Sequence, residues 1–414
     1  MPSQKDPKQL AIEKVKGPCL IKAGAGTGKT YAMVKKIAHM VNENIYKPKE
    51  ILCLTFSNEA TNHLREEVSK EIKNSSDITI RTFHGFCSDI LKELGNKIGI
   101  NPDFEVLQPD DAKVLMHKYL GIRPFDSNRY VTTISTAKDL GISMEQIEKY
   151  AESLKSSFKG IEDIDEYAKE MDFKLKTLHL RADNTREEKK EIKKFIDDYE
   201  EYVKYRSFIE AWKKYDQLKK EKNYQDYSDL NFNVLKVFNA YGADEISKKY
   251  KYVIVDEFQD TNKLQFDLIE YLARELEGIT AVGDQNQSIY AFRGSFGEVF
   301  SYFEERFKLK KEDIFNLEKS RRSPNRILRI AYQLIKNNYE NPKDCIKIEH
   351  YENKEGEKVK VIELKNGEEE ARKIAEIVEK EIEDGTPLNE ICVLHRTHAQ
   401  SKLIEQALES KISL

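Results

Sequence analysis

Short runs of apolar residues alternate along this chain with longer stretches in which apolar residues recur every three or four positions. The short runs predict buried strands, and the longer stretches predict amphipathic helices. The expected strands are 19–23, 51–56, 78–83, 252–256, 279–282, 359–364 and 391–395. Helical spacing fills most of the intervals between them, for example 58–73 and 264–276. This alternation predicts an α/β fold built on parallel sheets with crossover helices.

The alternation of strands and helices stops after about residue 100 and resumes near residue 250. The interval is rich in Lys, Glu, Asp and Tyr and has helical spacing with hardly any strand pattern. Within it, residues 183–201 are almost wholly charged, at the four-residue intervals typical of a solvated helix. We therefore expect an all-helical subdomain inserted into the α/β domain. Further along, residues 317–337 are expected to form the boundary into a second α/β unit, in which a strongly periodic helix at 368–384 lies between two expected strands.

Composition limits the class of protein. The 414 residues are 34% charged and 39% hydrophobic, with a formal net charge of −4, which is typical of a soluble protein of several domains. No apolar run is long enough to span a bilayer, and the N-terminus lacks a secretory segment, so we expect a cytoplasmic protein without a membrane partner. The five cysteines have no C-x-x-C spacing and are expected to be reduced, buried side chains. The slightly acidic total argues against nucleic-acid binding through bulk charge but does not exclude a local groove with aromatic stacking.

The strongest candidate for chemistry follows the first expected strand. Its glycine-rich turn ends in Gly-Lys-Thr and leads into helical sequence, so its backbone N–H groups and the helix N-terminus can surround an anion. Lys29 can reach the β- and γ-phosphates of a nucleotide, and the Thr30 hydroxyl can ligate Mg²⁺. The residues expected to hold the phosphates are Gly24, Ala25, Gly26, Thr27, Gly28, Lys29 and Thr30. The strict phosphate-loop pattern has Gly where this chain has Ala23. An accidental glycine-rich loop is the alternative, but the strand before and the helix after favour a nucleoside triphosphate site.

A second candidate is the pair of acids that ends the strand 252–256. Asp256 suits the metal ion, directly or through water, and Glu257 suits the orientation or deprotonation of an attacking water. Two surface acids at a strand end are the structural alternative. Four apolar residues immediately before them favour the catalytic interpretation.

These motifs, taken with five others, resemble the superfamily 1 helicases of the UvrD/PcrA/Rep type. The matching blocks are Gln9, 23–30, 55–58, 82–85, 256–261, 283–294 and 317–323, in the family's order. The resemblance implies a RecA-like P-loop NTPase that uses ATP and Mg²⁺ to move on single-stranded DNA or a 3′-tailed duplex, with 3′→5′ direction and a role such as DNA repair. It divides the chain into 1–100 and 226–316 as domain 1A, 101–225 as a helical 1B-like insertion, and 317–414 as part of a second RecA-like domain, 2A.

The resemblance also implies roles for single residues. Gln9 would read the adenine edge, Gln287 would contact the γ-phosphate and link it to the DNA, and Arg322 would reach the γ-phosphate when the domains close. Arg321 stands where the family has an adenine-stacking Tyr. The DNA contacts implied are Phe56, His84, Tyr290, Phe292 and Arg293. Aromatic faces stack on any base, which a translocase requires. Ordinary core packing is the alternative for Phe56, and a structural role is the alternative for His84. Phe83 is expected in the core.

The chain also departs from the family. Tyr31 and Glu59 stand where the family often has Arg and Lys. The second half of domain 2A, with the family's second arginine, is absent, so we expect a fragment rather than a natural short relative, and one that binds ATP and DNA but hydrolyses ATP weakly. Two alternatives remain open: the motor subunit of a nuclease–helicase or defence complex, with a nuclease or repair protein as partner, and a non-enzymatic ATP-gated DNA-binding module.

Overall fold

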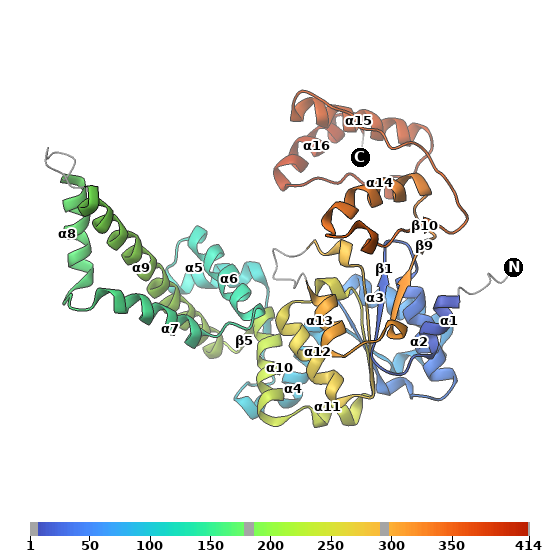
Figure 1. The fold of residues 1–414 in the computed structure, drawn as a ribbon, viewed down its shortest axis with the longest axis horizontal. Coiled ribbons are helices and arrows are strands. Elements are labelled where there is room, and N and C mark those ends of the chain that lie inside the picture. Colours follow the sequence, from blue (N-terminus) through green and yellow to red (C-terminus); the bar gives the residue numbers. More distant parts are fainter. Residues whose placement is uncertain (1–6, 178–185, 290–297, 413–414) are drawn as a thin grey trace. The chain divides into compact units, whose positions relative to one another are not determined.

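The computed structural model describes residues 7–177, 186–289 and 298–412 (Figure 1). The chain forms two compact units, residues 1–354 and residues 355–414, which are described separately.

A six-stranded sheet forms the centre of the first unit, and every pairing within it is parallel. The strand order is β3-β2-β6-β7-β1-β8. The strands are β1 (Cys19–Ala23), β2 (Ile51–Thr55), β3 (Thr79–Thr82), β6 (Tyr252–Val255), β7 (Gly278–Gly283) and β8 (Ile314–Leu317). The α/β prediction is confirmed. Strand β8 was not predicted, because three of its four residues are only half-buried and the apolar pattern of an edge strand is weak.

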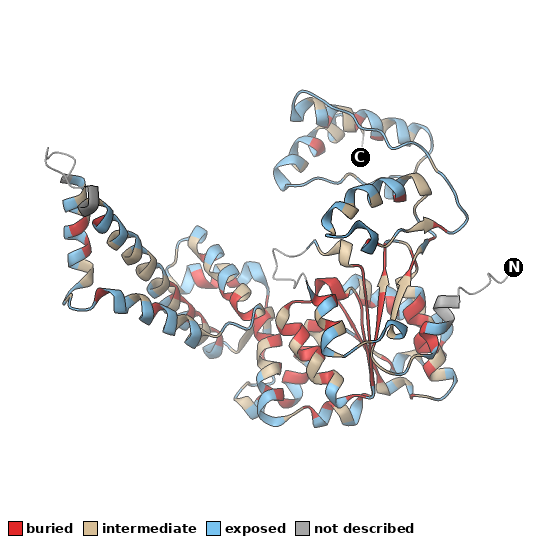
Figure 2. Ribbon diagram, viewed as in Figure 1, coloured by how far each residue is buried: buried red, intermediate tan, exposed pale blue. Residues whose placement is uncertain are grey.

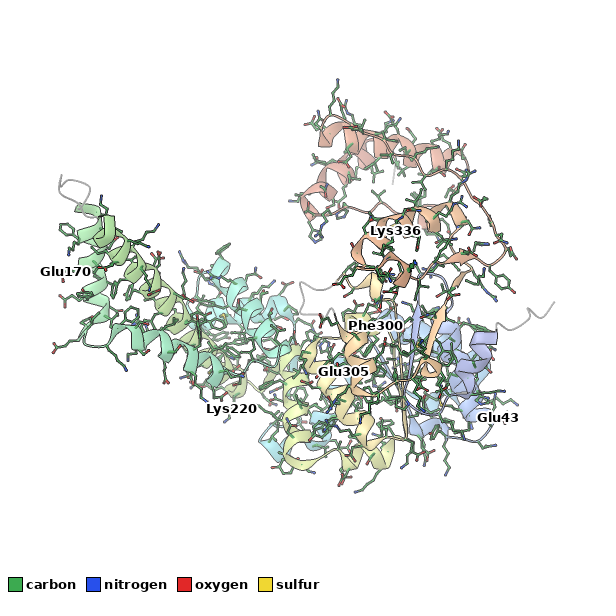
Figure 3. All side chains as sticks on the ribbon, viewed as in Figure 1. Glu43, Glu170, Lys220, Phe300, Glu305 and Lys336 are labelled. Atoms are coloured by element: carbon green, nitrogen blue, oxygen red, sulfur yellow. The ribbon has the colours of Figure 1, made fainter. Side chains whose placement is uncertain are left out.

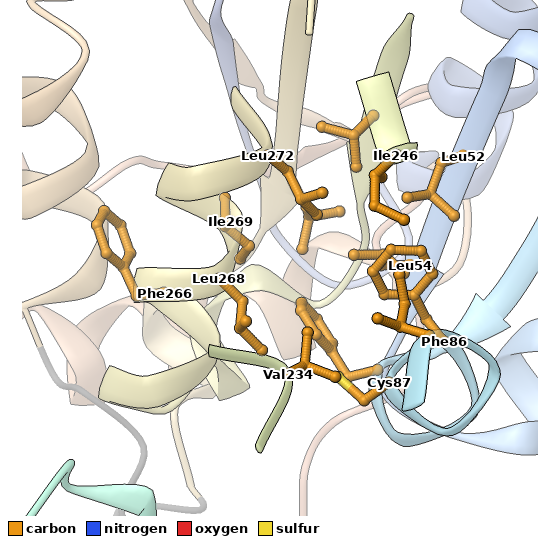
Figure 4. Close-up of a cluster of buried hydrophobic side chains, with 14 of the residues drawn as sticks. Leu52, Leu54, Phe86, Cys87, Val234, Ile246, Phe266, Leu268, Ile269 and Leu272 are labelled. Atoms are coloured by element: carbon orange, nitrogen blue, oxygen red, sulfur yellow. The ribbon is translucent and has the colours of Figure 1, made fainter. Parts of the chain in front are cut away.

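Both faces of the sheet are covered by helices because alternate residues of each strand point to opposite faces. Leu52 and Leu54 face one cluster, and Ile51 and Cys53 face the other. The first cluster, part of which appears in Figure 4, is completed by α4 (Phe83–Leu94), α10 (Tyr227–Tyr241), α12 (Lys263–Glu275) and α13 (Val299–Arg306). The second is completed by α1 (Pro7–Lys14), α2 (Lys29–Asn42) and α3 (Asn58–Glu71). Buried residues therefore concentrate in the strands and on the inner faces of these helices (Figure 2).

Between β3 and β6, the described residues at 109–221 form five α-helices. They are α5 (Pro109–Leu120), α6 (Pro124–Asp139), α7 (Met144–Lys155), α8 (Ile164–Thr177) and α9 (Arg186–Glu221). Two three-residue strands flank them, and β4 (Glu105–Leu107) pairs in parallel with β5 (Tyr224–Asp226). Sequence patterns missed this pair because three residues are too few to show alternation. The domain boundaries given above remain a prediction.

Beyond β8, the first unit continues through β9 (Lys319–Ser320), α14 (Asn325–Ile335), the short helix η10 (Lys336–Asn338) and β10 (Glu349–His350). Strand β9 pairs in parallel with β10.

The described part of the second unit contains two α-helices, α15 (Gly367–Glu383) and α16 (His398–Lys411), which bury Ala371, Ala375 and Ile404. The expected strands at 359–364 and 391–395 are wrong, because those residues form no strand in the structure. Val361 and Leu394 are 94% and 90% exposed. A strand needs a hydrogen-bonding neighbour, and the described part of this unit offers none.

Four of the five cysteines are buried and all are free thiols; Cys392, in one of the segments that does not form a strand, is exposed. Within the described ranges, no helix combines the length and apolar character needed to cross a bilayer.

Candidate functional site

The parallel sheet brings the candidate residues to a single edge. Because all six strands run the same way, the loops that follow them leave from the same side, where α/β proteins bind their ligands. The phosphate loop follows β1, the acids follow β6, and Gln287 follows β7. Phe56 follows β2, and His84 follows β3.

The phosphate loop has the geometry of an anion site. Gly26 and Gly28 have φ angles of +73° and +91°, which glycine adopts without strain. The Thr27 hydroxyl donates to the carbonyl oxygen of Gly24 at 2.7 Å and closes the turn. Helix α2 has Gly28 at its N-cap and no capping side chain, so its first N–H groups remain available to phosphate oxygens. Ala23 is buried in the core, which explains why a small apolar side chain is accepted there.

The two acids meet the phosphate loop through Lys29. Its ammonium lies 2.5 Å from Oε2 of Glu257. Glu257 has a left-handed conformation (φ +46°), which turns the chain sharply after β6, and its N–H donates to Oδ1 of Asp256 at 2.8 Å. Asp256 is 9% exposed. Burial, together with the charge of Glu257, raises the pKa of Asp256 to about 6.

The donor set fits Mg²⁺ only in company with a phosphate. Within the described residues, no group of three or more His, Cys, Asp or Glu side chains could hold a metal ion. Thr30 and Asp256 would supply two oxygen ligands, and Mg²⁺ normally completes its six ligands with waters and substrate phosphates. The open helix N-terminus and Lys29 fit the phosphates themselves.

A buried amide connects this pair to Gln287. Gln259 is 2% exposed, and its Nε2 donates to Oε2 of Glu257 at 2.8 Å. Its Oε1 accepts the N–H of Asp284 at 2.9 Å, and Oδ2 of Asp284 accepts from Nε2 of Gln287 at 2.7 Å. Lys29 and Gln287, which follow separate strands, thus belong to one hydrogen-bonded chain. Sequence reasoning did not single out Gln259, although a polar amide within the 256–261 block was an available signal.

The segment after β8 lies directly on the phosphate loop. Ser320 is fully buried, and its hydroxyl donates to the carbonyl oxygen of Ala25 at 3.2 Å. The N–H of Arg321 donates to the carbonyl oxygen of Gly26 at 2.9 Å. The side chains of Arg321 and Arg322 are exposed, and the Arg321 guanidinium stacks 4.7 Å from the ring centre of Tyr351. The structure therefore brings the predicted Arg322 beside the loop that it is expected to serve.

Two of the predicted DNA contacts line one groove. A cavity of about 460 Å³ is bordered by Phe56 and His84 and also by Gln108 and Tyr227. The rings of His84 and Tyr227 lie 4.8 Å apart, and the Tyr227 hydroxyl donates to Oε1 of Gln108 at 2.9 Å. Burial lowers the pKa of His84 to about 4, so this imidazole is neutral at physiological pH. Sequence analysis missed Tyr227, whose signal was an aromatic residue directly after the charged helical insertion.

The remaining predicted residues can be located only in part. Tyr290, Phe292 and Arg293 lie outside the described residues. Gln9 belongs to α1, but its side chain also lies outside the description. Phe83 is 5% exposed and lies in the core, as expected.

Comparison with known proteins agrees with this arrangement. Residues 4–308 match the family model of the UvrD/REP helicase N-terminal domain. The chain belongs to the UvrD/REP helicase family. Residues 315–412 match the UvrD-like helicase C-terminal domain, so the family assignment extends over both units.

Two individual relatives are named as DNA helicases. The chain is 30% identical over 411 residues to the ATP-dependent DNA helicase PcrA of Bacillus subtilis strain 168, covering 97% of this chain and 48% of that protein. It is 28% identical over 405 residues to the ATP-dependent DNA helicase PcrA of Staphylococcus aureus strain Mu50, covering 96% and 48%. The chain thus spans about half the length of the curated relatives it matches. The resemblance inferred from the motifs is confirmed at the level of the family.

Proposed function

We propose that this chain binds ATP with Mg²⁺ and single-stranded DNA, as part of an ATP-dependent DNA helicase or translocase. The observation that carries the proposal is the hydrogen-bonded chain from Lys29 through Glu257, Gln259 and Asp284 to Gln287. It joins a phosphate-binding loop to the loop after β7, at the sheet edge where the aromatic groove also opens. Movement 3′→5′, action on 3′-tailed duplexes, a role in DNA repair and a cytoplasmic location are parts of the same proposal that rest on the family resemblance.

The ion pair between Lys29 and Glu257 suggests how nucleotide binding prepares hydrolysis. On binding, Lys29 exchanges Oε2 of Glu257 for phosphate oxygens, because the triphosphate carries more negative charge than one carboxylate. The released carboxylate can then orient or deprotonate the attacking water. Thr30 and Asp256 would hold Mg²⁺, which neutralises charge on the phosphates. Gln287 and Arg322 are proposed to sense the γ-phosphate.

The groove between β2, β3 and Tyr227 suits unpaired bases. Each base stacked on an aromatic face contributes roughly 1–3 kcal/mol, whatever its identity. Phe56, His84 and Tyr227 offer such faces. The neutral state of His84 favours stacking over phosphate contact. The neighbouring predicted contacts Tyr290, Phe292 and Arg293 would extend this path.

The deciding experiment measures ATP hydrolysis by the chain and by Lys29→Ala, with and without oligo-dT. We expect DNA to stimulate hydrolysis, and Lys29→Ala to reduce it by about 10²- to 10³-fold, as for loss of a preorganised contact to developing charge. Lys35→Ala is the matched control, since Lys35 lies on the same helix and pairs with Glu71 at the surface. Hydrolysis that is measurable and equal in Lys29→Ala and the parent chain would refute the proposal.

A binding measurement makes the test independent of turnover. A fluorescent, non-hydrolysable ATP analogue should bind the parent chain and Lys35→Ala with similar affinity, and Lys29→Ala more weakly. Nucleotide-dependent DNA affinity without any hydrolysis would instead identify an ATP-gated DNA-binding module.

A further inference from the structure

A single phenol joins the segment after α14 to the turn that carries Gln287. Tyr339 follows η10, whose first residue Lys336 is labelled in Figure 3. Its hydroxyl donates to Oδ1 of Asn286 at 2.7 Å and accepts from Nε2 of Gln285 at 2.7 Å. A phenol has one proton to donate, so this pair of bonds uses that proton and one acceptor lone pair. Burial raises the pKa of Tyr339, so the proton stays in place at neutral pH.

The two amides belong to the turn η7 (Gln285–Gln287). Asp284 caps this turn, because its Oδ1 accepts the N–H of Asn286 at 3.0 Å while its Oδ2 accepts from Gln287. Tyr339 is therefore hydrogen-bonded to the two residues of the turn that precede Gln287. Through Asp284, the same turn continues to Gln259, Glu257 and Lys29.

The other end of the segment is attached to the phosphate loop. Ser320 donates to Ala25, and its Oγ also accepts the N–H groups of Arg322 and Ser323 at 3.3 Å each. Helix α14 begins at Asn325 and ends at Ile335, four residues before Tyr339. An α-helix of this length is a stiff rod of about 16 Å. The segment from Ser320 to Tyr339 is thus fastened to the sheet edge at two points, one on each side of α14.

We infer that Tyr339 is a positioning residue that makes the segment carrying Arg322 respond to the position of Gln287. Its two hydrogen bonds tie the turn 285–287 to the chain that follows α14. A displacement of this turn by bound nucleotide then moves the segment as a body, or breaks the two bonds. The inference rests on the proposed function, since it assumes that nucleotide and DNA bind at this edge. The turn 285–287 is the element with two states: in one it is hydrogen-bonded to the Tyr339 hydroxyl, and in the other these bonds are broken.

Tyr339→Phe tests this role, because it keeps the ring and removes both hydrogen bonds. The quantity to measure is the dissociation constant of fluorescent oligo-dT with and without a non-hydrolysable ATP analogue, and the ratio of the two constants is the coupling between the sites. For the parent chain we expect a ratio different from one. For Tyr339→Phe the ratio should shift toward one by a factor of about three to ten, because one or two neutral hydrogen bonds are lost. The affinities for DNA alone and for the analogue alone should change by less than about twofold, since Tyr339 is not assigned to either site.

Tyr332→Phe is the matched control, since Tyr332 lies on α14 and borders a different cavity, next to Lys347 and Glu349. It should keep the parent ratio. Asn286→Ala removes the acceptor of one bond and leaves the bond from Gln285, so combining it with Tyr339→Phe should reduce the coupling no further than Tyr339→Phe alone. Thermal unfolding of each variant confirms that it is folded.

The outcomes separate the two proposals. A parent chain that binds neither the analogue nor DNA refutes the proposed function. If the parent chain binds both the analogue and DNA, two results would overturn the inference about Tyr339. One is a parent ratio of the two DNA dissociation constants equal to one, and the other is a Tyr339→Phe ratio equal to that of the parent chain. A Tyr332→Phe variant that loses the coupling equally would also overturn it, because the effect would then not be specific to the hydroxyl of Tyr339.

Discussion

Glu257 connects the two halves of the candidate site, because it contacts both Lys29 and Asp256. Its left-handed backbone directs its side chain to Lys29, and its N–H binds the carboxylate of Asp256. A non-glycine residue in this conformation costs of order 1–3 kcal/mol, and such strain concentrates at functional sites.

The neighbouring Asp256 is held in an environment that disfavours its charged form. Its folded pKa of about 6 exceeds the usual 3.8, so between these two pH values the folded state retains a proton that the unfolded chain releases. The contribution of Asp256 to stability is therefore lost as the pH rises from about 4 to about 6.

The raised pKa of Asp256 predicts a pH-dependent metal site. Because a carboxylate must be ionised to ligate Mg²⁺, Mg²⁺-dependent binding of an ATP analogue should weaken by about tenfold as the pH falls from about 6 to 5, and should level off above about pH 7. The measurement is a titration with a fluorescent analogue at each pH, repeated with EDTA to give the metal-independent part. Asp256→Asn should remove the dependence. A flat profile between pH 5 and 7 for the parent chain would contradict the assignment.

At the scale of elements, the phosphate loop and the segment after β8 pack closely against each other. Strands β1 and β8 are neighbours, with Ala23 opposite Leu317, so the chains that follow them emerge side by side. A Cβ on Gly24 would lie 2.0 Å from Cδ1 of Ile348, and one on Gly26 would lie 2.5 Å from Cβ of Arg322. These two glycines therefore serve the approach of the second segment as well as the curvature of the loop.

Gly26→Ala should show this second role. The left-handed conformation of residue 26 costs alanine about 1–2 kcal/mol, and the added methyl must also displace Arg322. We expect the free energy of unfolding to fall by about 1–3 kcal/mol, measured by urea denaturation. Gly17→Ala is the control, because a Cβ there meets nothing within 4 Å and the residue has no positive φ. Equal unfolding free energies for Gly26→Ala and Gly17→Ala would show that the loop accommodates the side chain.

At the scale of the whole molecule, a buried ionic cluster joins the helical insertion to the α/β core. Lys138 on α6 and Lys219 on α9 are each 3% exposed. Both lie 2.5 Å from a carboxylate oxygen of Asp229 on α10, and Lys219 also lies 2.8 Å from Asp226. Although burial alone would raise the pKa of Asp226, the two lysines hold it well below its usual range. Because α10 packs into the core cluster of the sheet, the insertion is anchored by charge as well as by apolar contact.

Removing one cation from this cluster should destabilise the chain strongly. Lys219→Met leaves Asp226 and Asp229 to share Lys138, and breaking a buried pair from one side costs about 3–5 kcal/mol. Urea denaturation measures the loss. Lys220→Met provides the control, since the next residue is exposed (Figure 3) and should change the unfolding free energy by less than about 0.5 kcal/mol. Equal losses in both variants would mean that the cluster does not hold the insertion.

Local patterns were sufficient to predict much of this protein. Apolar runs predicted five of the six strands of the central sheet, and glycine spacing before Lys29 predicted the loop geometry. Both predictions succeed because backbone preference and alternate burial act over a few neighbouring residues. Blocks of motif then indicated the family without knowledge of any contact.

Features that need a partner distant in the sequence, such as strand pairing and side-chain contacts, became visible only in the tertiary structure. The segments 359–364 and 391–395 have strand-like sequence and form no strand, whereas β4 and β5 pair despite their three-residue length. Gln259, Tyr227 and Tyr339 each contact a residue that is distant in the sequence, namely Asp284, His84 and Asn286, respectively. A hydrogen bond or a stacked ring needs two groups in one place, and the order of strands in a sheet, which no local pattern encodes, determines which groups meet.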